Sequence, residues 1–129
     1  MNIKSVGLAA LVSSFILLGA SPVVVSAAPS EAVKTIAKII LTLNHHPSDG
    51  EKTQLKTIAT SGSEQEKVLA GAMINLDHKV TDGDKKALEK LKTDEYATPE
   101  MKDLAVIMIS LNHTPSDADK KKLSTIAGK

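Results

Sequence analysis

The chain has 129 residues, and its 16 basic residues, all lysine, nearly balance 15 acidic residues to leave a formal net charge of +1 at pH 7. This balance excludes a polybasic nucleic-acid binder, and the lack of arginine removes the guanidinium fork that usually recognises phosphate groups and guanine edges. The chain contains no cysteine, which excludes disulfides, thiolate metal sites, iron–sulfur clusters and a cysteine nucleophile.

The first part of the chain has the pattern of a secretory signal peptide. Lys4 precedes an apolar stretch over residues 6–20, and small residues at 25–27 form a signal peptidase site. We therefore predict a signal peptide over residues 1–27 and an exported protein, periplasmic or secreted. An uncleaved anchor is the alternative, because residues 6–28 nearly reach the length that spans a bilayer. The proline, the serines and the lack of a following basic cluster argue against an anchor, so we expect no stable membrane insertion after cleavage.

Residues 28–129 form one predicted domain built from a repeated unit. Residues 43–52 return at 76–85 and at 111–120, with leucine, histidine and aspartate at the same places, so the offsets are 33 and 35 residues. The match continues upstream and downstream of these segments. It divides the domain into copies of approximately 30–62, 63–97 and 98–129.

Each copy has the pattern of two helices joined by a short turn. Apolar residues at helical spacing predict the first helix, and its expected core residues are Ile36, Ile40, Leu69, Met73, Leu104 and Met108. The second helix begins with a hydroxyl and a carboxylate three residues later, as in a capping box: Ser48 with Glu51, Thr81 with Asp84, and Ser116 with Asp119. We therefore predict an all-α fold of three helical-hairpin repeats, six helices in all, forming a short α-solenoid or a compact superhelical bundle.

Three of the four histidines, His45, His78 and His113, occupy the same place in the three copies. The structural interpretation is that each one staples the turn at the end of the first helix. Imidazole can donate to the last helical carbonyls, and the preceding Asn or Asp tolerates the left-handed conformation found there. A hydrogen bond from each histidine to the aspartate four residues later (Asp49, Asp82 and Asp117) would hold the turn further.

A metal site is the alternative interpretation of the histidines, with Zn, Cu or Ni as the cofactor and His45, His46, His78, His113 and Asp49 as the candidate ligands. In stacked hairpins, equivalent positions lie about 8 to 10 Å apart, whereas one ion holds its ligand nitrogens at about 2 Å. On this argument the three recurrent histidines cannot share one ion, and a local site of His45, His46 and Asp49 remains. We expect Met73, Met101 and Met108 in the core and not as copper ligands.

No catalytic motif such as Gly-x-Ser-x-Gly or His-Glu-x-x-His occurs in the chain, so we expect a protein that is not an enzyme. The lysines are interspersed with acidic residues, which predicts a solvated face and no nucleic-acid partner. The leading hypothesis is an exported helical-repeat protein that binds an unknown protein or peptide partner at the cell envelope. The alternatives are a small histidine-dependent metal-binding protein and a pH-responsive envelope stress protein.

Overall fold

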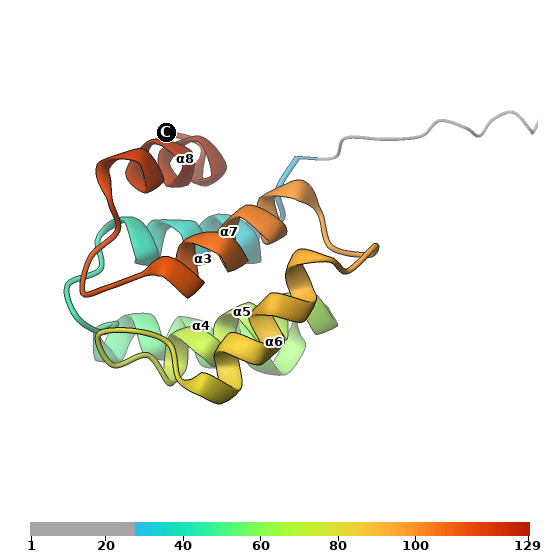
Figure 1. Ribbon diagram of the computed structural model, residues 1–129, viewed down its shortest axis with the longest axis horizontal. Helices are drawn as coiled ribbons and strands as arrows, with labels where there is room; N and C mark the ends of the chain where they lie inside the picture. The colour runs from blue at the N-terminus through green and yellow to red at the C-terminus, as the bar shows by residue number, and fades with distance from the viewer. Residues whose placement is uncertain (1–27) are drawn as a thin grey trace, which may run out of the picture.

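The computed structural model describes residues 28–129, and the predicted signal peptide lies outside this part of the chain. The described residues form six α-helices: α3 (Glu31–Leu41), α4 (Asp49–Ser61), α5 (Glu64–Ile74), α6 (Asp82–Lys92), α7 (Pro99–Ser110) and α8 (Asp117–Ala127) (Figure 1). Within residues 28–129 there are isolated β-bridges but no strand. The predicted all-α class is therefore confirmed. In this region, no helix has both the length and the apolar character needed to cross a membrane.

Every one of these helices begins at a serine or threonine whose side chain accepts a hydrogen bond from the backbone N–H three residues later; these residues are Ser30, Ser48, Ser63, Thr81, Thr98 and Ser116. In α4, Glu51 also reaches back to the N–H of Ser48, so the predicted capping box is complete. In α6, Asp84 instead accepts from the hydroxyl of Thr81 at 2.8 Å. Aspartate is one methylene shorter than glutamate, which explains why the reciprocal half of the box is missing there.

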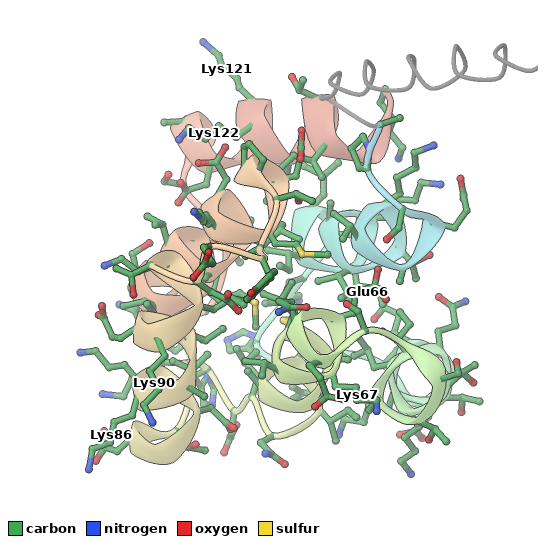
Figure 2. The ribbon with its side chains drawn as sticks, turned by 90° about the vertical axis from the view of Figure 1, so that its right-hand side faces the viewer. Glu66, Lys67, Lys86, Lys90, Lys121 and Lys122 are labelled. Atoms are coloured by element: carbon green, nitrogen blue, oxygen red, sulfur yellow. The ribbon has the colours of Figure 1, made fainter. Side chains whose placement is uncertain are left out.

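The core is aliphatic and forms where the first helices of the copies meet. The six residues that the sequence assigned to it are all fully buried: Ile36, Ile40, Leu69, Met73, Leu104 and Met108. The inner faces of α4, α6 and α8 each carry one fully buried leucine: Leu55, Leu88 and Leu123. Exposed lysines lie on the opposite faces, and Lys86 and Lys121 point away from the bundle (Figure 2).

The helices pair differently from the predicted hairpins. The closest neighbours are α4 with α5, α6 with α7, and α3 with α8, so most pairs join neighbouring copies. Within the copies, α5 also packs against α6, whereas α3 touches α4 only slightly. Gly62 makes the tight turn from α4 into α5, where a Cβ atom would lie 2.7 Å from the carbonyl oxygen of Ile58. Because α8 packs on α3, the first and last described helices meet and the helices form a compact bundle (Figure 1).

Candidate metal centre

The candidate site lies on the three connectors that join the helices of each copy, α3 to α4, α5 to α6 and α7 to α8. In each connector a buried apolar residue stands two positions before and two positions after the recurrent histidine: Leu43 and Pro47, Leu76 and Val80, and Leu111 and Pro115. The chain therefore leaves the core, passes through the histidine and returns to the core within five residues. Such a short excursion requires an abrupt reversal of the backbone at the histidine.

The histidines themselves make that reversal in the left-handed region. Their φ values are 76° for His45, 67° for His78 and 69° for His113, and no other non-glycine residue in the described part of the chain has a positive φ. The expectation that the preceding Asn or Asp would adopt this conformation was wrong. An L-residue in this region costs about 1 to 2 kcal/mol. Strain at three equivalent residues persists only where the surrounding structure imposes it.

A closed ring of backbone hydrogen bonds imposes the left-handed conformation on the three histidines. The N–H of His45 donates to the carbonyl of His113 at 3.0 Å, the N–H of His78 donates to the carbonyl of His45 at 3.0 Å, and the N–H of His113 donates to the carbonyl of His78 at 2.8 Å. Each histidine thus gives one bond and receives one. Short turns support the ring, since the N–H of His46 donates to the carbonyl of Asn44 at 3.0 Å. The three connectors are therefore fixed to one another at a single point.

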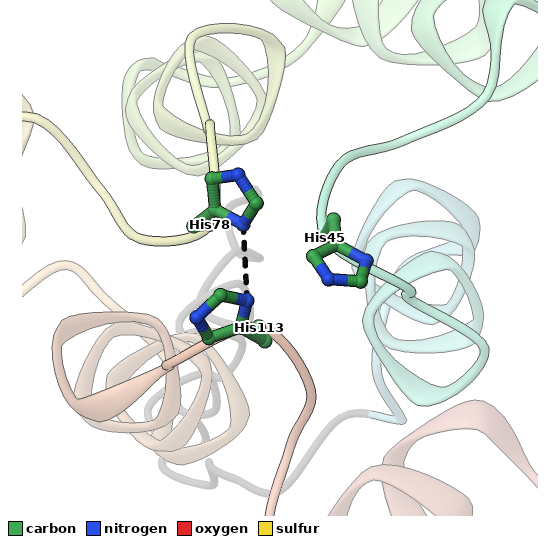
Figure 3. Close-up of side chains that lie close together, drawn as sticks. All are labelled: His45, His78 and His113. Carbon is green, nitrogen blue, oxygen red and sulfur yellow. Dashed lines mark hydrogen bonds between the residues drawn. The ribbon is translucent and has the colours of Figure 1, made fainter.

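This ring brings the three imidazoles together (Figure 3). Their centroids lie 4.9 Å apart for His45 and His78, 5.0 Å for His45 and His113, and 4.6 Å for His78 and His113. Nδ1 of His78 lies 3.0 Å from Nδ1 of His113. One ring nitrogen from each residue falls within 4.8 Å of the others. The expected separation of 8 to 10 Å was wrong, because it assumed an open stack whereas α8 closes onto α3.

These distances are close to those of a metal site. A four-coordinate zinc ion binds histidine nitrogen at about 2.0 to 2.1 Å, so the ligand nitrogens lie about 3.3 Å from one another. The three nitrogens, which lie within 4.8 Å of one another, would have to approach by up to about 1.5 Å to hold one ion. Among the described residues, this is the one group of three or more histidine or acidic side chains with such convergence. His46 and Asp49 do not belong to it, and Nδ1 of His46 lies 3.2 Å from the carbonyl oxygen of Pro47.

The surroundings of the cluster are open and polar. His78 and His113 are exposed, and the side chain of His78 is 48% exposed. In residues 28–129 none of the predicted hydrogen bonds from the recurrent histidines to Asp49, Asp82 or Asp117 forms; the carboxylate that approaches the cluster is Asp77, with Oδ1 3.5 Å from Nε2 of His78.

Several surface hollows are lined by other residues. One is lined by Gln65, Leu91 and Asp94 of α5, α6 and the loop that follows α6, and another by Thr35 and Ile58 of α3 and α4. In the first, Nε2 of Gln65 donates to Asp94 at 2.9 Å, and this bond, with a second from the N–H of Tyr96, lowers the pKa of the Asp94 carboxyl below its ordinary value. Asp94 thereby ties the loop after α6 to the start of α5. These are the helix ends opposite the connector that carries His78.

Comparison of the chain with models of known protein families, with curated proteins and with solved structures finds no match.

Proposed function

We propose that this protein binds a divalent transition-metal ion, Zn²⁺ foremost, through His45, His78 and His113. The observation that supports this function best is the convergence of one nitrogen from each ring to within 4.8 Å of the others. The ring of backbone bonds fixes the three Cα positions before any ion arrives, so binding would require little ordering beyond the side chains themselves. Left-handed backbone at residues other than glycine, as at these three histidines, also clusters at functional sites.

The donor set favours borderline ions. Imidazole nitrogen suits Zn²⁺, Cu²⁺ and Ni²⁺, whereas Ca²⁺ and Mg²⁺ require oxygen ligands. Three histidines with one open position are a known tetrahedral zinc site, while Cu²⁺ and Ni²⁺ prefer square or tetragonal sites. Three protein ligands leave a fourth position for water or another small ligand.

A binding or buffering role fits the surroundings better than catalysis. The cluster is exposed at the surface, and several surface hollows are lined by other residues. Together with the predicted signal peptide, the proposal describes an exported protein that takes up a metal ion outside the cytoplasm. The protein or peptide partner expected from the sequence remains a prediction, and it relied on the extended surface of an open stack.

The test is isothermal titration of tag-free protein with zinc, because a polyhistidine tag would itself bind the ion. We expect one zinc ion per chain and a dissociation constant in the micromolar range or below. His113→Asn should weaken binding by more than about 100-fold, since loss of an outer-sphere partner alone typically costs 10- to 100-fold. Asparagine also tolerates the left-handed conformation, so the backbone ring should persist.

The matched control is His46→Asn, which removes a neighbouring exposed histidine outside the cluster. This variant should bind zinc as the unchanged protein does. Equal weakening by both substitutions would assign the binding to scattered surface histidines, and the absence of zinc binding in the unchanged protein would end the proposal.

A further inference from the structure

The residue that precedes the histidine differs among the three copies. Copies one and three have Asn44 and Asn112 at this position, whereas copy two has Asp77. Oδ1 of Asp77 lies 3.5 Å from Nε2 of His78, while Nδ1 of the same ring lies 3.0 Å from Nδ1 of His113. The two nitrogens of His78 therefore face opposite kinds of neighbour: a carboxylate on one side and the centre of the histidine cluster on the other.

This arrangement favours one tautomer of His78. An ionised carboxylate can only accept a hydrogen bond, so it favours a proton on Nε2 of the neighbouring ring. In the neutral ring Nδ1 then carries the lone pair and points toward His113. The close approach of the two Nδ1 atoms requires that one of them donates and the other accepts, and the carboxylate of Asp77 favours His78 as the acceptor.

We propose that Asp77 is a positioning residue that holds His78 in the Nε2-protonated tautomer, so that His78 binds the metal ion through Nδ1. This inference rests on the proposed metal-binding function. A carboxylate on the far nitrogen of a ligating histidine fixes the ring and makes the ligand nitrogen more basic. Asparagine at the equivalent positions 44 and 112 carries no charge and cannot do this equally well. His78 is therefore the preset ligand of the three.

The same geometry determines which nitrogen of the His113 ring carries the proton. With the proton of His78 on Nε2, the hydrogen bond between the two Nδ1 atoms requires Nδ1 of His113 to donate. An ion at the centre of the cluster needs a lone pair from His113 as well, so this proton moves to the other nitrogen of the ring or leaves for solvent. His78 needs no such rearrangement, because Asp77 has already placed its proton away from the ion.

Asp77→Asn tests the proposal with a residue that the fold already accepts at both equivalent positions. Zinc affinity should fall by about 10- to 100-fold, the usual effect of losing such a partner. Glu95→Gln is the matched control, because Glu95 is an exposed acidic residue in the loop after α6 and its loss changes the net charge by the same amount. That variant should keep the affinity of the unchanged protein.

A second measurement reads the tautomer directly. Long-range ¹H–¹⁵N spectra of the metal-free protein at neutral pH should show His78 protonated at Nε2, and Asp77→Asn should shift the ring toward a mixture of tautomers. Unchanged affinity and an unchanged tautomer in Asp77→Asn would overturn the role of Asp77. If His113→Asn still abolished zinc binding in that case, the proposed metal function would stand alone. If the unchanged protein bound no zinc, both proposals would fail together.

Discussion

His45→Gly separates a structural role of the histidines from a metal-binding role. His45 has a φ of 76°, and in residues 28–129 its side chain makes no hydrogen bond, while its backbone N–H and carbonyl both belong to the ring. Glycine keeps both backbone bonds and removes the cost of the left-handed conformation, about 1 to 2 kcal/mol. The greater freedom of glycine in the unfolded chain lowers the free energy of unfolding by about 0.4 to 1 kcal/mol. Loss of the edge contacts between the His45 ring and its two neighbouring rings lowers the free energy of unfolding by up to about 1 kcal/mol more.

The sum predicts that His45→Gly changes the free energy of unfolding of the metal-free protein by between about −1 and about +1.5 kcal/mol. His45→Ala is the matched variant, because it removes the same ring and keeps the strained Cβ. The glycine variant should be the more stable of the two by about 1 kcal/mol. Urea unfolding in the presence of a chelator, followed by circular dichroism, measures both differences. A loss of more than about 1 kcal/mol in His45→Gly would mean that the imidazole stabilises the turn, and the structural interpretation would replace the metal-binding one.

Zinc at about 100 times its dissociation constant should stabilise the folded protein by about 2.7 kcal/mol and raise its Tm by roughly 10 to 20 °C, whereas His113→Asn should show almost no shift; a rise of equal size in both proteins would contradict the assigned ligands. Leu104→Ala, at a fully buried position, should cost about 2 to 5 kcal/mol, and a near-neutral result would contradict the core. Gly62→Ala should cost about 1 to 3 kcal/mol because the new Cβ would meet the Ile58 carbonyl, whereas Gly71→Ala, with open space at its Cβ inside α5, should stabilise by about 0.5 to 1 kcal/mol. Because the pKa of Asp94 is lowered in the folded protein, its carboxylate stabilises the fold above the ordinary aspartate pKa of about 3.9 and loses that effect as the pH falls through its folded value. The difference in unfolding free energy between the unchanged protein and Asp94→Asn should therefore shrink below about pH 4, and a constant difference would contradict the role of the Gln65 bond.

The features that the sequence predicted correctly are local ones. A hydroxyl at the N-cap and apolar residues at helical spacing act within one or two turns of the chain, so Ser48 and the stripe of Ile36 and Ile40 could be recognised without knowing the fold. The pairing of helices is not local. The same apolar stripe on α3 would be buried by α4 in an isolated hairpin or by α8 in a closed bundle, and the spacing of its residues does not distinguish the two.

The sequence of the terminal helices would have distinguished an open array of hairpins from a closed bundle. An open array exposes its two end faces to water, so its terminal repeats are polar on the outside. Here the helices of the first and last copies are as apolar as the middle ones, since α3 buries Val33 and Ile39 and α8 buries Leu123 and Ile126. The broad apolar face of α3, which includes Ile39 besides Ile36 and Ile40, requires a further helix to cover it, and in the structure α8 packs there. Once α8 packs on α3, the three connectors meet, and a histidine that recurs once in each copy no longer stands in a row but contributes one ring to a single cluster.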